Sequence, residues 1–352
     1  MSLRRSPLPS LQEIFPGDSE MARRMRAIDW QHTALGRPLT WPESLRTALG
    51  ICLGSRFALH VWWGKDLTLF YNDAYISFLG PIKHPAVLGR SGREAWSEIW
   101  SMIGPMIERV LTTGEASWSE DTLMYFDRNV PAEEVYVTFS FSPIIGDRGE
   151  VAGLFCASTE TTEKLVSNRR LETLRLLGVR AAQANSVEQA CRTSVDVLGK
   201  NPQDIPFAGI YLVDDTGTSA ELCHATAGAS EVLPRSASLT DERGRRSALA
   251  AVAFSRRVEE VTDVALVDAI IPPPVENLPV TALVLPILGT TRDVVVGLLV
   301  VGVSPHRVLD GAYRSFFDLV AGHLNDSPAA AGIPSETIAE VITSGGAPTG
   351  HA

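Results

Sequence analysis

Cysteine is scarce in this sequence. Only four cysteines occur among 352 residues, and they lie far apart, at Cys52, Cys156, Cys191 and Cys223. No two of them have the CxxC spacing of a zinc site or a local redox pair. The sequence therefore predicts no metal site, and widely separated cysteines favour a reducing cytoplasm.

Long apolar runs are also missing. The basic N-terminal segment is not followed by an apolar stretch of signal-peptide length. No segment has the ~18 uninterrupted apolar residues that a membrane-spanning helix needs. The longest apolar run, residues 294–303, is interrupted by Gly297 and Gly302 and is rich in β-branched residues, which predicts a buried strand. We expect a cytoplasmic protein without membrane insertion.

Positive charge is in short supply. The chain has 31 Lys and Arg against 41 Asp and Glu, a formal net charge of −10. Proteins that bind the phosphate backbone concentrate Lys and Arg, so nucleic acid is not an expected partner. The basic cluster at Arg23, Arg24 and Arg26 has no interleaved aromatic residues and is interpreted as the solvated side of a helix.

Catalytic signatures are not found either. None of the seven histidines is followed by Glu or Asp, as a phospho-accepting histidine box requires. The glycine-rich stretch from Gly345 lacks the lysine and the preceding strand of a P-loop. We therefore predict no catalytic residues and a protein that is not an enzyme.

What is present is enough apolar sequence for two domains. Hydrophobic residues make up 45% of the chain, and domains commonly occupy roughly 100–200 residues. In the first half, residues 57–63 and 67–71 read as a hairpin, and a helix is expected before them with Thr40 as its cap. Helical spacing returns over residues 91–113, where we expect Gly104-Pro105 to divide the segment into two helices.

Two long strands close the first half. Residues 134–143 alternate between apolar and polar side chains, which places Val135, Val137, Phe139 and Phe141 on one face. Residues 150–159 follow after a Gly-Asp-Arg-Gly turn and are predicted to be the last strand of this half.

The segment from 161 to 185 is predicted to be a helix that connects the two halves. Heptad-like spacing indicates a homodimer and signalling face, for which the candidates are Leu165, Leu171, Leu174, Leu177 and Ala181. The alternative is a helix that packs on its own domain, since the stripe covers three heptads or fewer.

The second half begins with a capping box at Ser186-Val-Glu-Gln. Strands are predicted at residues 207–213, 220–227, 258–261, 281–287 and 294–303, with helices over residues 246–256 and 310–324. Residues 272–274 are prolines in a predicted loop.

In these segments the chain resembles the PAS–GAF sensory region of bacterial hybrid sensor histidine kinases and related signalling regulators. The PAS resemblance is carried by Trp41-Pro-Glu-Ser-Leu, Leu69-Phe-Tyr-Asn-Asp-Ala-Tyr, Lys83-His-Pro, Leu88-Gly-Arg, Trp96-Ser-Glu-Ile-Trp and Ile103-Gly-Pro-Met. The GAF resemblance is carried by Ile205-Pro-Phe-Ala, Ala282-Leu-Val-Leu-Pro-Ile, Gly302-Val-Ser-Pro-His-Arg and Tyr313-Arg-Ser-Phe-Phe-Asp-Leu-Val-Ala. The resemblance covers residues 15 to 324.

The resemblance implies an α+β fold. A PAS-like five-stranded antiparallel sheet with helices over one face should be followed by a GAF-like α/β sandwich with an antiparallel sheet of about six strands. The expected divisions are a loosely packed leader (1–39), a PAS-like sensor domain (40–160), the connecting helix (161–185), a GAF-like sensor domain (186–325) and a disordered tail (326–352).

The same resemblance raises the question of bound chromophores. The sequence has no Asn-Cys pair of the kind that flavin-binding PAS domains use. Cys223-His224 is the only adjacent Cys-His pair, and strand alternation predicts that one side chain is core and the other surface. We therefore predict no cofactor. The sequence does not exclude haem binding, because His60 or His84 can point inward and serve as the axial ligand.

A small-molecule pocket is the remaining candidate site. Aromatic side chains with a few polar groups are typical of such cavities and equally of ordinary cores. The candidates for a PAS-like pocket are Phe70, Tyr75, Phe78, Trp96, Trp100, Phe139 and Phe141.

These observations favour a non-catalytic sensory protein that binds a small ligand or a partner and relays its state through the connecting helix. A kinase or a response regulator of a two-component system is an expected signalling partner. One alternative is the sensory half of a histidine kinase or a PP2C-type phosphatase, because the resemblance ends where a kinase would continue. Another is a structural interaction module without a ligand.

Overall fold

The computed structural model describes residues 10–181, 183–227, 229, 233–241, 247–262, 281–290 and 292–327. The chain divides into two compact units, residues 1–165 (unit 1) and 166–352 (unit 2). Both are mixed α and β units with antiparallel sheets, as the resemblance implies. The predicted loop at 272–274 lies outside the described residues, as does the predicted tail from residue 328 onward.

Unit 1 is built on a five-stranded antiparallel sheet in the order β2-β1-β5-β4-β3. Its strands are β1 Ala58–Trp63, β2 Thr68–Tyr71, β3 Ser119–Phe126, β4 Glu133–Ile145 and β5 Val151–Glu160. Its α-helices are α1 Leu11–Ile14, α2 Glu20–Ala27, α3 Glu43–Gly54, α4 Ile76–Lys83, α5 Gly92–Ala95 and α6 Trp100–Thr113. Short 3-10 turns are η1 Trp30–His32, η2 Pro38–Thr40, η3 Asp73–Tyr75 and η4 Ser97–Ile99. The predicted hairpin is present as β1 and β2.

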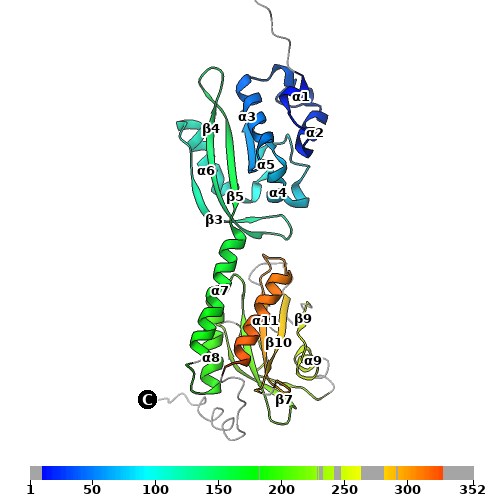
Figure 1. The fold of residues 1–352 in the computed structure, drawn as a ribbon, viewed down its shortest axis with the longest axis vertical. Helices are drawn as coiled ribbons and strands as arrows, with labels where there is room; N and C mark the ends of the chain where they lie inside the picture. The colour runs from blue at the N-terminus through cyan, green and yellow to red at the C-terminus, as the bar shows by residue number, and fades with distance from the viewer. Residues whose placement is uncertain are drawn as a thin grey trace, which may run out of the picture. The chain divides into compact units, whose positions relative to one another are not determined.

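Helices cover both faces of this sheet, not one as expected (Figure 1). Successive residues of β1 point to opposite faces. His60 and Trp62 point toward α4, η4 and α6, whose side chains share a cavity with them. Val61 pairs across the strands with Phe70, and the Phe70 ring stacks on Trp30 with ring centroids 5.2 Å apart. The N-terminal helices therefore supply the second layer.

The prediction of a loosely packed leader is wrong for residues 10–39. Side chains from this segment belong to the core of unit 1; they are Ile14, Phe15, Met21, Met25 and Trp30. Asp73 accepts hydrogen bonds from the backbone N–H groups of Glu20 and Met21 at 3.0 and 2.9 Å, and so caps α2 from the sheet side of the unit. Apolar burial and this long-range cap fix the segment on the domain.

Two local predictions are also corrected. Thr40 does not cap α3, because Pro42 occupies the N-cap position. Asp147, from the β4–β5 hairpin, instead accepts hydrogen bonds from the N–H groups of Glu43 and Ser44 at 3.2 and 3.1 Å.

Pro105 does not divide α6, which runs unbroken from Trp100 to Thr113. A proline at this position removes one i→i−4 hydrogen bond, but burial of the apolar face formed by Ile103, Ile107 and Val110 holds the helix together.

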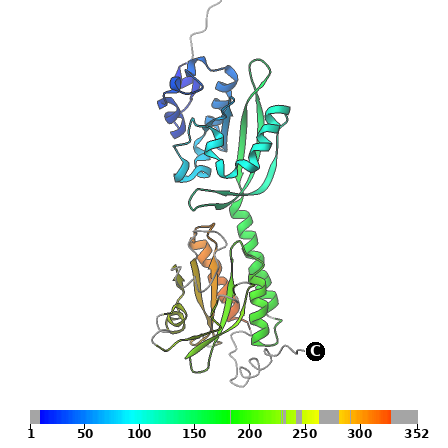
Figure 2. The same cartoon turned by 180° about the vertical axis from the view of Figure 1, so that it is seen from behind.

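Unit 2 contains a six-stranded antiparallel sheet in the order β8-β7-β6-β11-β10-β9. Figure 2 shows the ribbon of this unit from behind. The strands are β6 Ala208–Val213, β7 Ser219–Ala225, β8 Ser236–Ser238, β9 Glu259–Val261, β10 Thr281–Leu288 and β11 Val295–Val303. The described helices are α7 Thr162–Ala181, α8 Val187–Leu198, α9 Ala248–Ser255 and α11 Gly311–Asn325. The three-residue strand β8 was not predicted, since it is too short to show a pattern.

From residue 166 onward, α7 packs with α8 and α11 against one face of the unit 2 sheet. Leu177 is fully buried in this core and Leu174 is half-buried against it, so the structure corrects their prediction as part of a free dimer face. Leu165 is half-buried, whereas Leu171 is 66% exposed. The side chain of Ala181 is outside the described structure.

A buried ion cluster anchors α7 to unit 2. Asp204 accepts hydrogen bonds from Arg169 at 2.7 Å and from Arg170 at 3.0 Å. The guanidinium of Arg170 also lies 4.0 Å from the ring centroid of Tyr313 on α11. Charge pairing and cation–π contact therefore fasten one side of α7 in place.

Among the described residues, no helix combines the length and the apolar character needed to cross a membrane.

Candidate ligand site

A small cavity of about 30 Å³ lies in the core of unit 1. Strands β1, β3, β4 and β5 form one wall, and α4, η4 and α6 form the other. Its lining residues are His60, Trp62, Tyr75, Phe78, Trp96, Ile99, Ile103, Met124, Phe126, Val137, Phe139, Phe141, Cys156 and Ser158. A space of this size holds one or two water molecules.

Five of the seven predicted pocket residues line this cavity: Tyr75, Phe78, Trp96, Phe139 and Phe141. Phe70 does not, because the alternation of β2 places it on the opposite face against Trp30 and Trp41. Trp100 is half-buried and packs behind Trp62, with ring centroids 6.0 Å apart. These two positions are corrections to the predicted pocket.

His60 is the most unusual lining residue. Its side chain is almost completely buried, and neither ring nitrogen has a hydrogen-bond partner among the described residues. The surrounding rings of Trp62 and Tyr75 lie with centroids 4.7 and 4.6 Å away. Burial in this apolar setting lowers the pKa of His60 to about 3, so the imidazole is neutral at pH 7 and offers one donor and one acceptor.

The rest of the lining is also uncharged. No Asp, Glu, Lys or Arg side chain is among the described residues that line the cavity. Burial raises the pKa of the Cys156 thiol to about 12 and raises the pKa of Tyr75. The indole N–H of Trp62 is a further buried donor without a described partner. The cavity therefore suits polar but neutral chemistry.

The buried imidazole makes unit 1 sensitive to acid. His60 takes up a proton near its ordinary pKa of 6.5 in the unfolded chain but only at about 3 in the folded one. The free energy of unfolding of unit 1 therefore has its full value above pH 6.5. It falls as the pH drops below 6.5, and the loss is about 2 kcal/mol at pH 5. We expect His60→Phe to flatten the pH dependence of denaturant unfolding followed by tryptophan fluorescence. His32→Phe replaces an exposed histidine and should leave the pH dependence of the unfolding free energy unchanged. The same pH dependence in His60→Phe as in wild type would contradict the burial argument.

Neither histidine proposed for haem fits that cofactor. Nδ1 of His84 lies 3.0 Å from the Tyr71 hydroxyl, and its Nε2 lies 3.1 Å from Glu20, so both ring nitrogens are engaged. His60 faces a space of about 30 Å³, which is far smaller than a macrocycle.

Cys223 and His224 depart from simple alternation. The register of β6 and β7 shifts between the pairs Ile210–His224 and Tyr211–Leu222, so Cys223 is the extra residue of a β-bulge. Cys223 packs against the same core as α8, and Nε2 of His224 lies 3.8 Å from Asp196 of α8. The predicted division into one core and one surface side chain is therefore wrong, because the bulge re-aims both residues.

Comparison with known proteins gives the following similarities. A family model described as PAS fold matches residues 55–165. The GAF domain of an Acinetobacter phosphoenolpyruvate-protein phosphotransferase is 18% identical, covers 51% of this chain and 98% of its own, and has a TM-score of 0.35. The corresponding Coxiella burnetii domain is 19% identical, with coverages of 50% and 96% and a TM-score of 0.34. The reduced form of fRMsr of Staphylococcus aureus is 14% identical, with coverages of 46% and 95% and a TM-score of 0.36.

A search of curated proteins found no match. The structural neighbours have TM-scores below 0.5, so the GAF-like description of unit 2 rests on its own six-stranded antiparallel sheet between helices. Unit 1 has the five-stranded sheet expected of the PAS fold that its sequence matches. The chain is an α+β protein with a PAS-like unit followed by a GAF-like unit.

Proposed function

We propose that this chain is a cytoplasmic, non-catalytic sensory protein whose PAS-like unit binds a small uncharged polar molecule in the cavity around His60. The observation that carries this proposal is the pair of buried ring nitrogens on His60 without a described partner. Leaving such groups unsatisfied costs about 1–3 kcal/mol each. An occupant that bonds to them recovers this free energy, which gives the cavity a reason to bind a polar molecule.

The chemistry of the ligand follows from the lining. The described walls supply no charged side chain, and burying an unpaired charge is very costly. Neutral His60 offers one donor and one acceptor, and the aromatic rings offer apolar contact. A neutral molecule with a hydroxyl, carbonyl or amide group matches this set. The space of about 30 Å³ holds one or two waters, so we propose that binding of a somewhat larger neutral molecule is coupled to a rotamer change of the lining aromatic side chains.

The cavity is connected to α7 by a short stretch of the chain. Cys156 and Ser158 of β5 line the cavity, and α7 begins at Thr162, two residues after β5 ends at Glu160. The Thr162 hydroxyl accepts a hydrogen bond from the backbone N–H of Tyr136 on β4 at 3.0 Å. A change in the cavity that shifts β5 therefore acts on the first turn of the helix. We propose this as the relay from the ligand to the connecting helix.

The test removes the two ring nitrogens of His60 from the cavity. Native mass spectrometry of the full chain, purified without denaturant, should show a bound molecule or a mass shift with a panel of neutral metabolites. His60→Phe keeps an aromatic ring but removes both buried nitrogens, and it should weaken binding about tenfold or more, as expected for lost buried hydrogen bonds. Trp100→Phe is the control, since this ring packs against Trp62 outside the lining. Equal binding by wild type and His60→Phe would contradict the proposed site.

The proposal includes a homodimer that signals to a kinase or a response regulator. Leu177 is buried in unit 2 and Leu174 is half-buried, so the apolar side chains that α7 leaves to solvent include Leu171, 66% exposed, and Val179, 49% exposed. Leu171→Asp should convert a dimer to a monomer in light scattering at micromolar concentration. A wild type that is monomeric at that concentration contradicts the dimer. The cytoplasmic location is proposed because all four cysteines are free thiols.

A further inference from the structure

An ion pair joins two of the elements that wall the cavity of unit 1. Lys83 is the last residue of α4, and its ammonium group pairs with the carboxylate of Glu98 on η4. Phe78 of α4 and Ile99 of η4 both line the cavity. The ion pair therefore holds together two short segments of the wall that lies opposite the sheet.

Trp96 connects this ion pair to the cavity. Its side chain is 2% exposed and lines the cavity, and the ammonium group of Lys83 lies 4.0 Å from its ring centroid. A cation over an aromatic face is attracted to it. The side chains of Lys83 and Glu98 are 10% and 21% exposed, so the charged groups lie nearer to solvent than the indole does. Lys83 thus holds both Glu98 and Trp96 in a closed arrangement.

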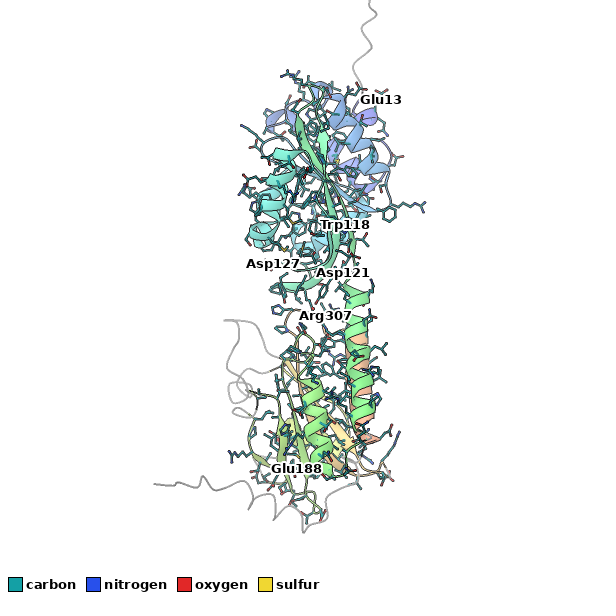
Figure 3. The ribbon with its side chains drawn as sticks, turned by 90° about the vertical axis from the view of Figure 1, so that its left-hand side faces the viewer. Glu13, Trp118, Asp121, Asp127, Glu188 and Arg307 are labelled. Carbon is teal, nitrogen blue, oxygen red and sulfur yellow. The ribbon has the colours of Figure 1, made fainter. Side chains whose placement is uncertain are left out.

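The position of Lys83 depends on nearby carboxylates. Burial lowers the pKa of Lys83, whereas the hydrogen bond and charge of Glu98 and the charge of Asp127 oppose this shift. Asp127 is exposed, follows the end of β3 and is labelled in Figure 3. A half-buried cation that loses its anion is costly, so removal of the Glu98 charge favours an arrangement in which Lys83 reaches water.

The backbone indicates which side of the ion pair can move. Lys83 is followed by His84, whose two ring nitrogens are both engaged, so this end of α4 is attached to the rest of unit 1. In contrast, η4 has only three residues, and Trp96 before it has the non-helical angles φ −126° and ψ 35°. Such a short 3-10 turn has few hydrogen bonds of its own. We therefore take Lys83 as the anchored side and η4 with Trp96 as the movable side.

We propose that the Lys83–Glu98 ion pair is a gate for the cavity around His60: it holds η4 and Trp96 against α4, and a neutral ligand enters when the pair separates. This inference rests on the proposed ligand site and identifies Trp96 as the lining ring that moves. Opening does not require a ligand, because partly exposed side chains change rotamer in ordinary thermal motion. The gate can therefore be tested without knowing which molecule the cavity binds.

Cys156 provides a probe of the opening. It lines the cavity and is 1% exposed, so a thiol reagent reaches it only when the cavity opens or the unit unfolds. Cys52 is completely buried in the same unit and is not among the described residues that line the cavity, so its labelling reports unfolding. Burial raises the pKa of both thiols to about 12, which gives them similar intrinsic reactivity.

The experiment treats the reduced, folded full chain with methyl methanethiosulfonate, a small neutral thiol reagent. Labelling over time is measured by trypsin digestion and mass spectrometry, with Cys156 in peptide 149–164 and Cys52 in peptide 47–56. In wild type, Cys156 should be labelled faster than Cys52, because a local opening occurs more often than unfolding of the whole unit. Equal rates for the two thiols in wild type would contradict a separate opening of the cavity.

Two variants test the role of the ion pair. Glu98→Gln keeps the size of the side chain but removes its charge, and it should raise the labelling rate of Cys156 at least about tenfold, because loss of one partner destabilises the closed arrangement. Lys83→Met keeps an apolar side chain beside Trp96 and should have the same effect. Glu115→Gln is the matched control, since it breaks an exposed ion pair with Arg109 in the same unit and should leave the rate unchanged.

The two thiols distinguish a gate from general stabilisation. Unchanged labelling of Cys156 in both Glu98→Gln and Lys83→Met would overturn the proposal. An equal acceleration of Cys52 and Cys156 would also overturn it, because the ion pair would then stabilise the whole unit. Ligand binding in native mass spectrometry is a separate measurement: faster Cys156 labelling with no bound molecule would support the gate and contradict the ligand site.

Discussion

Replacing Trp30 with alanine should lower the free energy of unfolding of unit 1 by about 3–5 kcal/mol, the usual cost of removing a buried tryptophan. Trp30 is 2% exposed. Its ring stacks on Phe70 at 5.2 Å and meets Trp41 at 5.2 Å, and its indole N–H donates to the Met25 carbonyl at 2.7 Å. The substitution therefore removes the centre of the layer that covers one face of the sheet.

The measurement is denaturant unfolding followed by tryptophan fluorescence. All seven tryptophans lie in unit 1, so this signal reports unit 1 alone. Trp118→Ala is the matched control, since Trp118 is 67% exposed in the same unit and is labelled in Figure 3. A Trp30→Ala midpoint as little changed as that of Trp118→Ala would contradict the assignment of residues 10–39 to the core of unit 1.

The N-terminal segment is a part of the fold that local sequence patterns do not predict. The patterns over β1, β2, β4 and β5 predict strands because alternation is a local property of the chain. Residues 10–39 are rich in charge and have no long period, yet isolated apolar residues such as Phe15 and Trp30 are buried. Their partners, Trp41 and Phe70, lie in other elements. Burial of this kind depends on tertiary contact and leaves little local signal.

The cavity was predictable in part for the same reason. Alternation in β4 places Phe139 and Phe141 on one face, and both line the cavity. Applied to β1, the same alternation places His60 and Trp62 together, which would have added two lining residues. Alternation alone does not show which face of β2 is covered by the helices that line the cavity. The prediction therefore places Phe70 in the pocket, although it lies on the opposite face. The β-bulge at Cys223 was not predictable either, because no residue pattern marks it.

Asp204→Asn should destabilise unit 2 by about 3–5 kcal/mol, the usual effect of removing one partner from a buried ion pair. The Asp204 carboxylate is fully buried and bonds to Arg169, to Arg170 and, at 3.0 Å, to the side-chain amide of Asn201. An asparagine keeps the shape but leaves two guanidinium groups without their anion. Hydrogen exchange of peptides from α8 and α11, measured by mass spectrometry, should show the loss. Glu172→Gln removes an exposed pair with Arg175 and should leave that exchange unchanged.

The same carboxylate sets the response of unit 2 to acid. Burial opposes ionisation of Asp204, but the hydrogen bond from Arg169 and the charges of Arg170 and Arg169 outweigh it and lower the pKa below the ordinary 3.8. A carboxylate with a lowered pKa contributes its full share of the unfolding free energy well above pH 3.8. This contribution is lost as the pH falls through the pKa of the folded state. Unit 1 loses stability already below pH 6.5 through His60, so acidification should begin to destabilise unit 1 at a higher pH than unit 2. Asp204→Asn should reduce the acid-dependent loss of stability in unit 2, to which Asp214 with its pKa of about 2 also contributes, and should leave that of unit 1 unchanged. A single transition that both units share at every pH would contradict this separation.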